Sequence, residues 1–327
     1  VLVAIVSIAI IGVAAIWALN PFAPEVVVTN PVPEGRRITD HGLLANYYPP
    51  QGNGKRAGIL LLGGSEGGLS PGVGRMAKGL QANGFAVLQV AYFAAPGLPP
   101  KLELVPLETF DRALDWLKSQ PEVDAERIGI VGGSKGAEAA LIIATRRPEL
   151  RAVVAAMPSS VAWQGIDWNI MNMILNPPGG SWSLGGKPIP FLPYAQPKQF
   201  GGPVVDIYAA SLETLAQHQD AIIPVERIRA PVLLICGMAD KLWPSCPMAD
   251  QVKARASANN GPAVTVLAYN DAGHAVMGLP VDKSNSNYAR LDRMGGTNDG
   301  NNDARADGWP KIVAHLEAAL TTPSPAQ

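Results

Sequence analysis

Residues 127–147 of the chain read RIGIVGGSKGAEAALIIATRR. A short apolar run leads into Gly132-Gly133-Ser134-Lys135-Gly136, and residues of helical composition follow at once. This G-x-S-x-G pattern is typical of a sharp strand-to-helix turn that holds a serine clear of the sheet, above a helix N-terminus. The flanking glycines let the backbone pass closely without a Cβ clash. The stretch predicts Ser134 as a nucleophile, with a merely structural Gly-Ser turn as the alternative.

The same pattern occurs a second time, at Gly63-Gly64-Ser65-Glu66-Gly67. It follows an apolar run, but the residues after Glu66 read GGLSPG and cannot begin a helix at once, so Ser134 is favoured. The second loop ends an early strand, where this arrangement supplies one backbone N–H to an oxyanion hole. We expect the donors to be the N–H of Lys135 and of Gly64 or Ser65. A plain glycine-rich turn is the alternative.

Outward from this stretch, apolar strand patterns alternate with helical ones. Strands are predicted at residues 57–62, 85–92, 127–131, 152–156, 231–236 and 263–268, and helices at 74–82, 107–119, 135–147 and 309–320. Such alternation predicts a mostly parallel sheet covered by helices on both faces. Together with the strand–turn–helix serine, it indicates an α/β protein with the α/β-hydrolase fold.

One long segment, residues 159 to about 228, breaks this alternation and contains many Pro, Gly and Trp residues. A stretch of this length without clear periodicity is better interpreted as an inserted functional unit than as a plain loop. Because it lies between two core strands, we expect a cap over the active site. Trp163, Trp168 and Trp182 in it favour an apolar acyl substrate, unless they simply pack.

The four histidines leave one good candidate for the base, since the chain order in this fold is nucleophile, acid, base. His41 precedes the nucleophile, His218 lies in the cap, and His315 falls on a face of the last helix. His274 follows the strand at 263–268, in a loop to which Gly273 gives freedom. We therefore predict His274 as the base.

The acid should follow the preceding strand, and PVLLICGMAD ends in Asp240. Its carboxylate would hold the imidazole tautomer and stabilise the imidazolium. A turn aspartate is the alternative, while Asp250 comes well after the strand end and Asp271 is too close to His274 in sequence. No His/Cys cluster has metal-ligand spacing, and no nucleotide-binding motif occurs, so neither a metal nor a cofactor is expected.

Composition excludes some partners. Lys plus Arg number 26 and Asp plus Glu 27, which gives a net charge of −1 and no basic field for nucleic acid. Cys236 and Cys246 are the two cysteines. Because Cys236 lies inside an apolar strand pattern, two unpaired thiols are favoured over one bridge between them.

The first 19 residues, VLVAIVSIAIIGVAAIWAL, carry no charge, and about 20 apolar residues span a bilayer as a helix. We expect residues 1–20 to be a transmembrane anchor that uses the lipid bilayer as a partner, with a signal segment or a buried helix as alternatives. Residues 21–54 are interpreted as a Pro-rich tether and the start of the domain, and 55–327 as the catalytic domain. The first positive charges are Arg36 and Arg37, so the flank favours a catalytic domain outside the cytoplasm.

Several motifs point to a known family: LLGGSEGGL, GIVGGSKGAEAAL, IPVERIRAPVLLICGMADKLWPS and AGHAVM. Over roughly residues 55–320 the chain resembles the C-terminal catalytic domain of acyl-CoA thioester hydrolases and bile acid-CoA:amino acid N-acyltransferases. By position, the resemblance implies a triad of Ser134, Asp240 and His274. The acyltransferases use a cysteine nucleophile, so Ser134 implies hydrolysis over transfer. We expect the apolar segment and tether to stand in the place of the family's N-terminal β-sandwich domain.

The sequence therefore predicts a serine hydrolase that cleaves a small-molecule acyl ester or thioester through an acyl-enzyme intermediate. A dienelactone hydrolase-like or other carboxylic ester hydrolase is one alternative. A catalytically silent binding protein on the same fold is another. The acyl chain, the leaving group and the oligomeric state stay open.

Overall fold

A computed structural model of the chain describes Gly12, Asn20, residues 25–196 and residues 202–321. Its centre is an eight-stranded sheet in the order β1-β2-β4-β3-β6-β7-β10-β11. The strands are β1 (Arg36–Ile38), β2 (Leu44–Tyr48), β3 (Arg56–Leu62), β4 (Ala86–Ala91), β6 (Val123–Gly133), β7 (Ala152–Ala156), β10 (Val232–Gly237) and β11 (Val264–Tyr269). From β4 to β11 all neighbours are parallel, which confirms the predicted mostly parallel sheet.

The N-terminal edge of the sheet lies within residues 21–54, which were interpreted as a tether and the start of the domain. β1 pairs antiparallel with β2, and β2 pairs antiparallel with β4. The chain before β1 is also bound to the domain, because the Thr29 N–H donates to the Leu69 carbonyl at 3.0 Å and the Leu69 N–H donates to Val27 at 2.9 Å. The prolines leave no clear periodicity in this part of the sequence. Backbone hydrogen bonds nevertheless hold it against the sheet.

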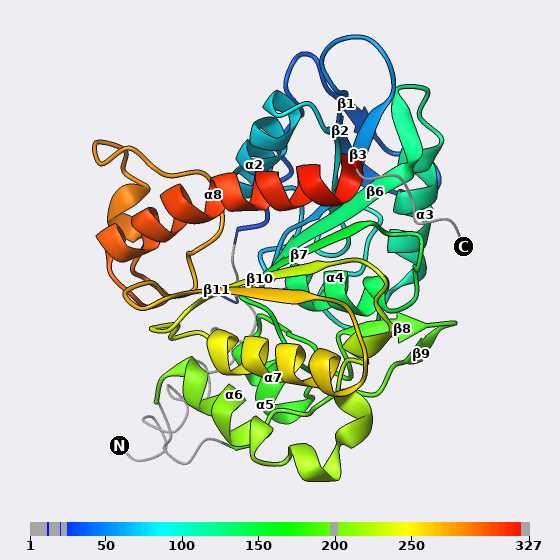
Figure 1. Cartoon of the computed structure of the whole chain (residues 1–327). Helices are drawn as coiled ribbons and strands as arrows, with labels where there is room; N and C mark the ends of the chain where they lie inside the picture. Colours follow the sequence, from blue (N-terminus) through cyan, green and yellow to red (C-terminus); the bar gives the residue numbers. More distant parts are fainter. Residues whose placement is uncertain (1–11, 13–19, 21–24, 197–201, 322–327) are drawn as a thin grey trace, which may run out of the picture.

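Helices cover both faces of the sheet (Figure 1). On β3, Ile59 and Leu61 face the layer of α2 (Pro71–Ala82) and α8 (Asn298–Thr321), while Leu60 and Leu62 face the opposite layer. That second layer contains α3 (Glu108–Lys118), α4 (Lys135–Ala144) and α7 (Ser245–Ala258). Strand side chains alternate between faces, and here both faces are buried, so the strands read as continuous apolar runs.

The start of the last helix was predicted too far along the sequence. α8 starts at Asn298, whereas the amphipathic pattern suggested residue 309. Pro310 lies inside the helix, and the first turns read NDGNNDARADG, a composition typical of loops. Tertiary contacts outweigh that local preference, because Asn301 is fully buried and its amide donates to the carbonyls of Leu291, Gly295 and Thr297.

Between β7 and β10, where a cap was expected, the chain forms several short elements. They are α5 (Ile170–Leu175), β8 (Trp182–Leu184), β9 (Lys187–Pro188), α6 (Val204–Leu212) and three 3₁₀ turns, Leu215–Gln217, Gln219–Ala221 and Val225–Arg227. β8 also pairs in parallel with β5 (Val105–Pro106), which precedes α3. One further 3₁₀ turn, Tyr288–Arg290, precedes α8. The segment is therefore folded, although no single period runs through it.

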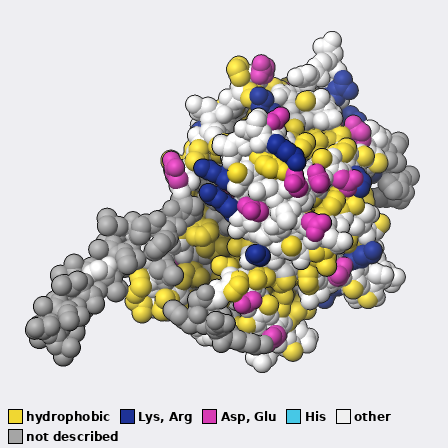
Figure 2. Space-filling view, turned by 90° about the vertical axis from the view of Figure 1, so that its left-hand side faces the viewer, with side chains coloured by type: hydrophobic (Ala, Val, Ile, Leu, Met, Phe, Trp, Pro, Cys, Tyr) yellow, Lys and Arg dark blue, Asp and Glu magenta, His cyan; other side chains and the backbone are white. Residues whose placement is uncertain are grey.

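The predicted membrane segment, residues 1–19, lies outside the described residues apart from Gly12. Within the described ranges no helix is both long and apolar enough to cross a bilayer. On the face shown in Figure 2, basic and acidic side chains are intermixed among apolar ones, as the near-zero net charge suggests.

Candidate active site

The predicted strand–turn–helix geometry is present at Ser134, which stands between the end of β6 and the start of α4. Its φ is +55°, an uncommon conformation for a residue with a side chain. The two glycines that flank this turn, Gly132 and Gly136, are required because other backbone atoms lie too close to leave room for a side chain. A Cβ at Gly132 would lie 2.1 Å from the Gly136 carbonyl oxygen, and one at Gly136 would lie 2.2 Å from that of Gly63.

The structure brings the three predicted side chains together. His274 Nε2 lies 2.9 Å from Ser134 Oγ, and His274 Nδ1 lies 2.8 Å from Asp240 Oδ2. Four per cent of the His274 side chain and 2% of the Asp240 side chain are exposed. His274 follows β11, Asp240 follows β10 and Ser134 follows β6. The carboxyl ends of these three strands meet at one edge of the sheet, which is where open α/β sheets place their sites. A serine, an imidazole and a carboxylate in this order can activate the hydroxyl by general-base catalysis.

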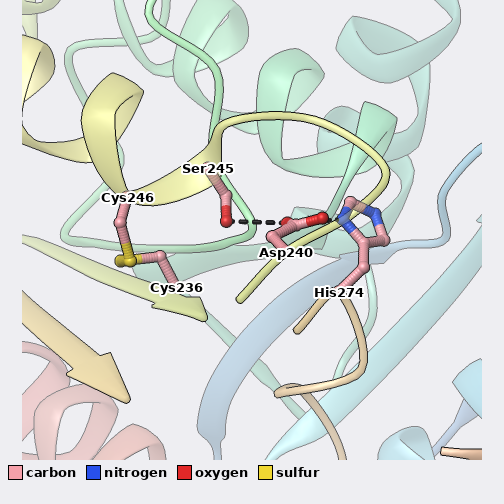
Figure 3. The surroundings of a disulfide bond; sticks show 5 residues. All are labelled: Cys236, Asp240, Ser245, Cys246 and His274. Carbon is pink, nitrogen blue, oxygen red and sulfur yellow. Dashed lines mark hydrogen bonds and ion pairs between the residues drawn. A yellow bond between two sulfur atoms is a disulfide. The ribbon is translucent and has the colours of Figure 1, made fainter. Parts of the chain in front are cut away.

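The residues that follow β10 fix both oxygens of Asp240, and Figure 3 shows its contacts with Ser245 and His274. Oδ1 accepts the N–H groups of Leu242 at 2.9 Å and Trp243 at 3.3 Å. Oδ2 accepts the hydroxyl of Ser245 at 2.7 Å besides facing His274. These contacts hold the carboxylate in one orientation, with Oδ2 toward the imidazole.

The prediction of two unpaired thiols is wrong, because Cys236 and Cys246 form a disulfide. Cys236 is in β10 and Cys246 is in the first turn of α7, so the bridge closes the loop that carries Asp240 (Figure 3). The apolar sequence around Cys236 correctly indicated that the residue is buried, but it wrongly favoured a free thiol. Only the packing of α7 against β10 brings the two sulfur atoms together.

The loop carrying His274 is fixed by backbone crossings. The His274 N–H and the Lys241 N–H both donate to the Met294 carbonyl at 3.1 Å, and the Gly273 N–H donates to Asn301 Oδ1 at 2.9 Å. A Cβ on Gly273 would lie 2.2 Å from the Gly295 backbone. Gly273 is therefore required by close packing, and the predicted loop freedom is not its role.

Tyr92, just after β4, orients the loop that was expected to form the oxyanion hole. Its hydroxyl lies 2.7 Å from the Gly63 carbonyl oxygen and 2.9 Å from that of Gly64. In a planar trans peptide the N–H points opposite to the C=O. Holding the Gly64 carbonyl against Tyr92 therefore turns the Ser65 N–H the other way. Burial raises the pKa of Tyr92 well above its usual value, so the hydroxyl keeps its proton.

Glu66 lies beside Gly64, because a Cβ on Gly64 would be 2.9 Å from Glu66 Oε2. Glu66 Oε1 accepts the Ser70 hydroxyl at 3.2 Å. Burial raises the pKa of Glu66, and hydrogen bonds to its carboxylate oppose the rise. Of the two predicted loop donors, Ser65 is the one whose N–H the Tyr92 contact turns to the opposite side of the peptide. The other predicted donor, Lys135, is the first residue of α4, where backbone N–H groups lack helical partners.

The side chain of Lys135 is buried beneath the elbow. Lys135 Nζ lies 2.8 Å from Glu138 Oε2 and 2.8 Å from the Ser181 hydroxyl. Glu138 Oε1 in turn accepts the Trp163 N–H and the Trp182 indole N–H. Burial lowers the pKa of Lys135 and raises that of Glu138, while each partner opposes the other's shift. The pair connects the segment between β7 and β10 to α4, the helix that follows Ser134.

A cavity of about 800 Å³ opens beside Ser134 and His274. Of the three tryptophans expected near the substrate, only Trp168 lines it, and its indole N–H donates to the Ser65 carbonyl at 3.3 Å. Trp163 and Trp182 are fully buried in the protein interior. For those two residues the packing alternative is the correct one.

Sequence reasoning missed several residues that support the site: Tyr92, Glu138, Ser181, Ser245 and Asn301. A signal existed for two of them. Tyr92 ends an apolar strand on the same sheet edge as the elbow, and Glu138 is the only charge within the apolar helix GAEAALIIA. Ser181, Ser245 and Asn301 reach the site only through the tertiary structure, and no local sequence pattern indicates their contacts.

Comparison with known proteins places this geometry in a family. The model of the family "BAAT / Acyl-CoA thioester hydrolase C terminal" matches residues 105–322. The chain belongs to this family. Among its relatives, acyl-coenzyme A thioesterase 5 of Mus musculus is 28% identical over 91% of this chain and 67% of its own length. Mitochondrial acyl-coenzyme A thioesterase 2 of Homo sapiens is 30% identical over 78% of this chain and 48% of its own length.

Solved structures agree on the fold. A putative dienelactone hydrolase from Klebsiella pneumoniae is 17% identical, with a TM-score of 0.54, and the match covers 86% of this chain and 96% of that one. A puromycin-hydrolyzing peptidase from Mycobacterium tuberculosis is 14% identical, with a TM-score of 0.57 over 90% of this chain and 40% of that one. Family and fold together identify an α/β-hydrolase, as the sequence motifs suggested.

Proposed function

We propose that the protein is a serine hydrolase that cleaves acyl esters or thioesters through a covalent acyl-enzyme intermediate. The observation that carries this proposal is the continuous contact from Ser134 Oγ through His274 to Asp240, at 2.9 and 2.8 Å. His274 accepts the proton of Ser134 as its oxygen attacks the acyl carbonyl, and Asp240 stabilises the imidazolium. His274 then returns the proton to the leaving group.

The negative charge that develops on the carbonyl oxygen needs fixed donors. We assign this role to the N–H groups of Lys135 and Ser65. The neighbouring loop supports it, since the Tyr92 hydroxyl holds the carbonyl groups of Gly63 and Gly64. Water, activated by His274, then attacks the acyl-enzyme and releases the acid.

Thioesters are the preferred substrate class because several relatives are named acyl-coenzyme A thioesterases. The chain spans about half to two thirds of the length of these relatives. An oxygen ester is the second candidate, and the structural similarity to a dienelactone hydrolase favours it. Matched thioesters and oxygen esters of one acyl group, assayed side by side, would separate the two.

The deciding experiment is intact-mass analysis after treatment with a fluorophosphonate, on the wild type and on Ser134→Ala. We expect one adduct on the wild type and none on the variant. Hydrolysis by the variant should fall by about a thousandfold or more. A folded wild type that takes no adduct and hydrolyses no ester would instead support the silent binding protein.

We also propose that the catalytic domain works outside the cytoplasm. The disulfide between Cys236 and Cys246 supports this location, because disulfides persist in oxidising compartments and are rare in the cytosol. The uncharged sequence of residues 1–19 agrees with it. Protease accessibility of a tagged chain in intact cells or spheroplasts would test the location, and full protection of the domain would contradict it.

A further inference from the structure

One wall of the cavity beside Ser134 carries three basic side chains. Arg75 and Lys78 come from α2, and Arg305 comes from α8. The two helices meet nearby, since a Cβ on Gly79 would lie 2.6 Å from the ring of Trp309. Arg75 and Lys78 are exposed, and Arg305 is half-buried. Segments more than 200 residues apart thus bring three positive charges to the same wall.

Arg305 is anchored close to the reacting groups. Its Nε donates to the carbonyl of Ala275, the residue after His274, at 2.6 Å. Its guanidinium also lies against Gly278, since a Cβ there would be 3.8 Å from Arg305 Cζ. The preceding residue, Met277, places its Sδ 3.0 Å from the Cβ position of Gly133 in the elbow. The charged wall therefore adjoins the base and the nucleophile.

Among the described residues, no carboxylate forms an ion pair with this basic wall. Burial, with a contribution from the charge of Arg75, lowers the pKa of Arg305 to about 10. Across the described ranges, no ion pair joins Arg75, Lys78 or Arg305 to a carboxylate.

Two carboxylates share the cavity wall, Glu66 and Asp282. Each is engaged elsewhere, Glu66 with its own loop and Asp282 with Ser284. Like charges held together in a partly buried site repel each other, and a bound anion offsets that cost. Guanidinium groups suit carboxylate and phosphate oxygens best, since they donate two parallel hydrogen bonds.

We propose that Arg75, Lys78 and Arg305 form a subsite for a phosphate or carboxylate group carried by the substrate. The inference rests on the proposed hydrolase function and extends it to an anionic substrate. The anion can reach the wall from either side of the scissile bond, as a phosphate on the leaving group or as a terminal carboxylate on the acyl chain.

Three thioesters distinguish these sources. Butyryl-pantetheine is the uncharged reference, butyryl-coenzyme A adds phosphates to the leaving group, and the pantetheine monothioester of glutaric acid adds a carboxylate to the acyl group. In the wild type, kcat/KM for at least one charged substrate should exceed that of the reference by about tenfold or more. In Arg75→Ala/Lys78→Ala that ratio should fall to about threefold or less, and in the wild type it should also fall as salt screens the exposed cations.

Lys187→Ala/Lys253→Ala is the matched control, because both lysines are exposed and lie outside the cavity. It changes the net charge by the same amount as Arg75→Ala/Lys78→Ala. It should keep the wild-type ratio. A gain for the coenzyme A substrate alone assigns the anion to the leaving group, and a gain for the glutaryl substrate alone assigns it to the acyl group. Equal rates on all three, or a gain that survives in Arg75→Ala/Lys78→Ala, would overturn the subsite while leaving the hydrolase intact. No turnover of any thioester or oxygen ester would overturn the proposed function itself.

Discussion

A single phenol orients the loop of residues 63–65, which we propose as the oxyanion loop. Tyr92 is 3% exposed, and its hydroxyl lies within hydrogen-bond distance of two consecutive carbonyls next to Ser65. In Tyr92→Phe the ring keeps its packing, but the Gly64–Ser65 peptide gains freedom to rotate. We expect kcat to fall about tenfold, on the order of 1.4 kcal/mol of transition-state stabilisation, with KM nearly unchanged.

Steady-state kinetics check this prediction, with Tyr48→Phe as the control. Tyr48 is also buried, but its hydroxyl contacts Gln89, away from the oxyanion loop. Both variants should lose a similar, small amount of stability, about 1 kcal/mol. Equal kcat in the two variants would show that Tyr92 has no role beyond packing.

His315 links stability to pH through one buried nitrogen. Its Nε2 is buried and has no hydrogen-bond partner within the described residues, and burial lowers its pKa below the ordinary 6.5. Below about pH 6.5 the unfolded chain therefore binds a proton that the folded chain does not. Its contribution to stability is present above pH 6.5 and is lost progressively as the pH falls below that value.

We expect His315→Leu to unfold in urea with a shallower loss of stability between pH 7 and pH 5 than the wild type. His41→Asn is the control, because His41 is exposed and Asn tolerates its φ of +53°. That variant should follow the wild-type curve. If stability falls equally with pH in all three proteins, His315 does not contribute to the acid sensitivity.

At the scale of an element, the loop between β10 and α7 carries Asp240 and is closed by the disulfide. The bridge spans 10 positions in sequence. Cys236→Ala/Cys246→Ala should lower the free energy of unfolding by about 2–3 kcal/mol, since the cross-link restricts the unfolded chain. A few-fold loss of kcat should accompany it, because Asp240 depends on the order of this loop.

Urea unfolding and alkylation followed by mass analysis check this prediction. The denatured, unreduced protein should take up no alkylating reagent, and the reduced protein should take it up at both cysteines. Alkylation of both thiols without reduction would show that the bridge is absent from the purified protein.

α8 shows how one element supports several loops. Asn301, in its first turn, accepts the Gly273 N–H next to His274 and donates to three carbonyls of the preceding loop. Further along the same helix, Arg305 holds Ala275. The polar first turns of the helix, which made its start unrecognisable in the sequence, are thus the part that contacts the loop of His274.

At the scale of the whole molecule, the Lys135–Glu138 pair connects two parts of the fold. Its partners Ser181, Trp163 and Trp182 all belong to the segment between β7 and β10. Lys135→Met leaves a buried carboxylate without its cation, so we expect a loss of about 3–5 kcal/mol of stability. Adding Glu138→Gln removes that charge and keeps an acceptor for both tryptophans, so the double variant should be more stable than Lys135→Met.

A double-mutant cycle in urea measures this coupling. Additive costs for Lys135→Met and Glu138→Gln would show that the pair is not coupled. The exposed pair of Lys311 and Asp307 on α8 is a suitable reference, since exposed ion pairs contribute little to stability.

The strands and most helices could be predicted because burial on both faces of a parallel sheet leaves continuous apolar runs in the sequence. The edge strands β1 and β2 were missed because they are only three and five residues long and follow a proline-rich stretch. Ser134, Asp240 and His274 could be named in advance, since each follows a core strand and chain order limits the choice. Their catalytic roles stay predictions until the variants are assayed.

The sequence by itself determined the alternation of strands and helices, the glycines of the elbow and the order of the three candidate catalytic residues, because these depend on local periodicity and backbone sterics. Only the tertiary structure decided the disulfide, the orientation of the oxyanion loop by Tyr92, the buried Lys135–Glu138 pair and the basic wall formed by Arg75, Lys78 and Arg305. Each of those joins atoms from segments that the packing of helices, loops and sheet brings together, or depends on the burial that this packing creates. A local pattern carries no information about such distances.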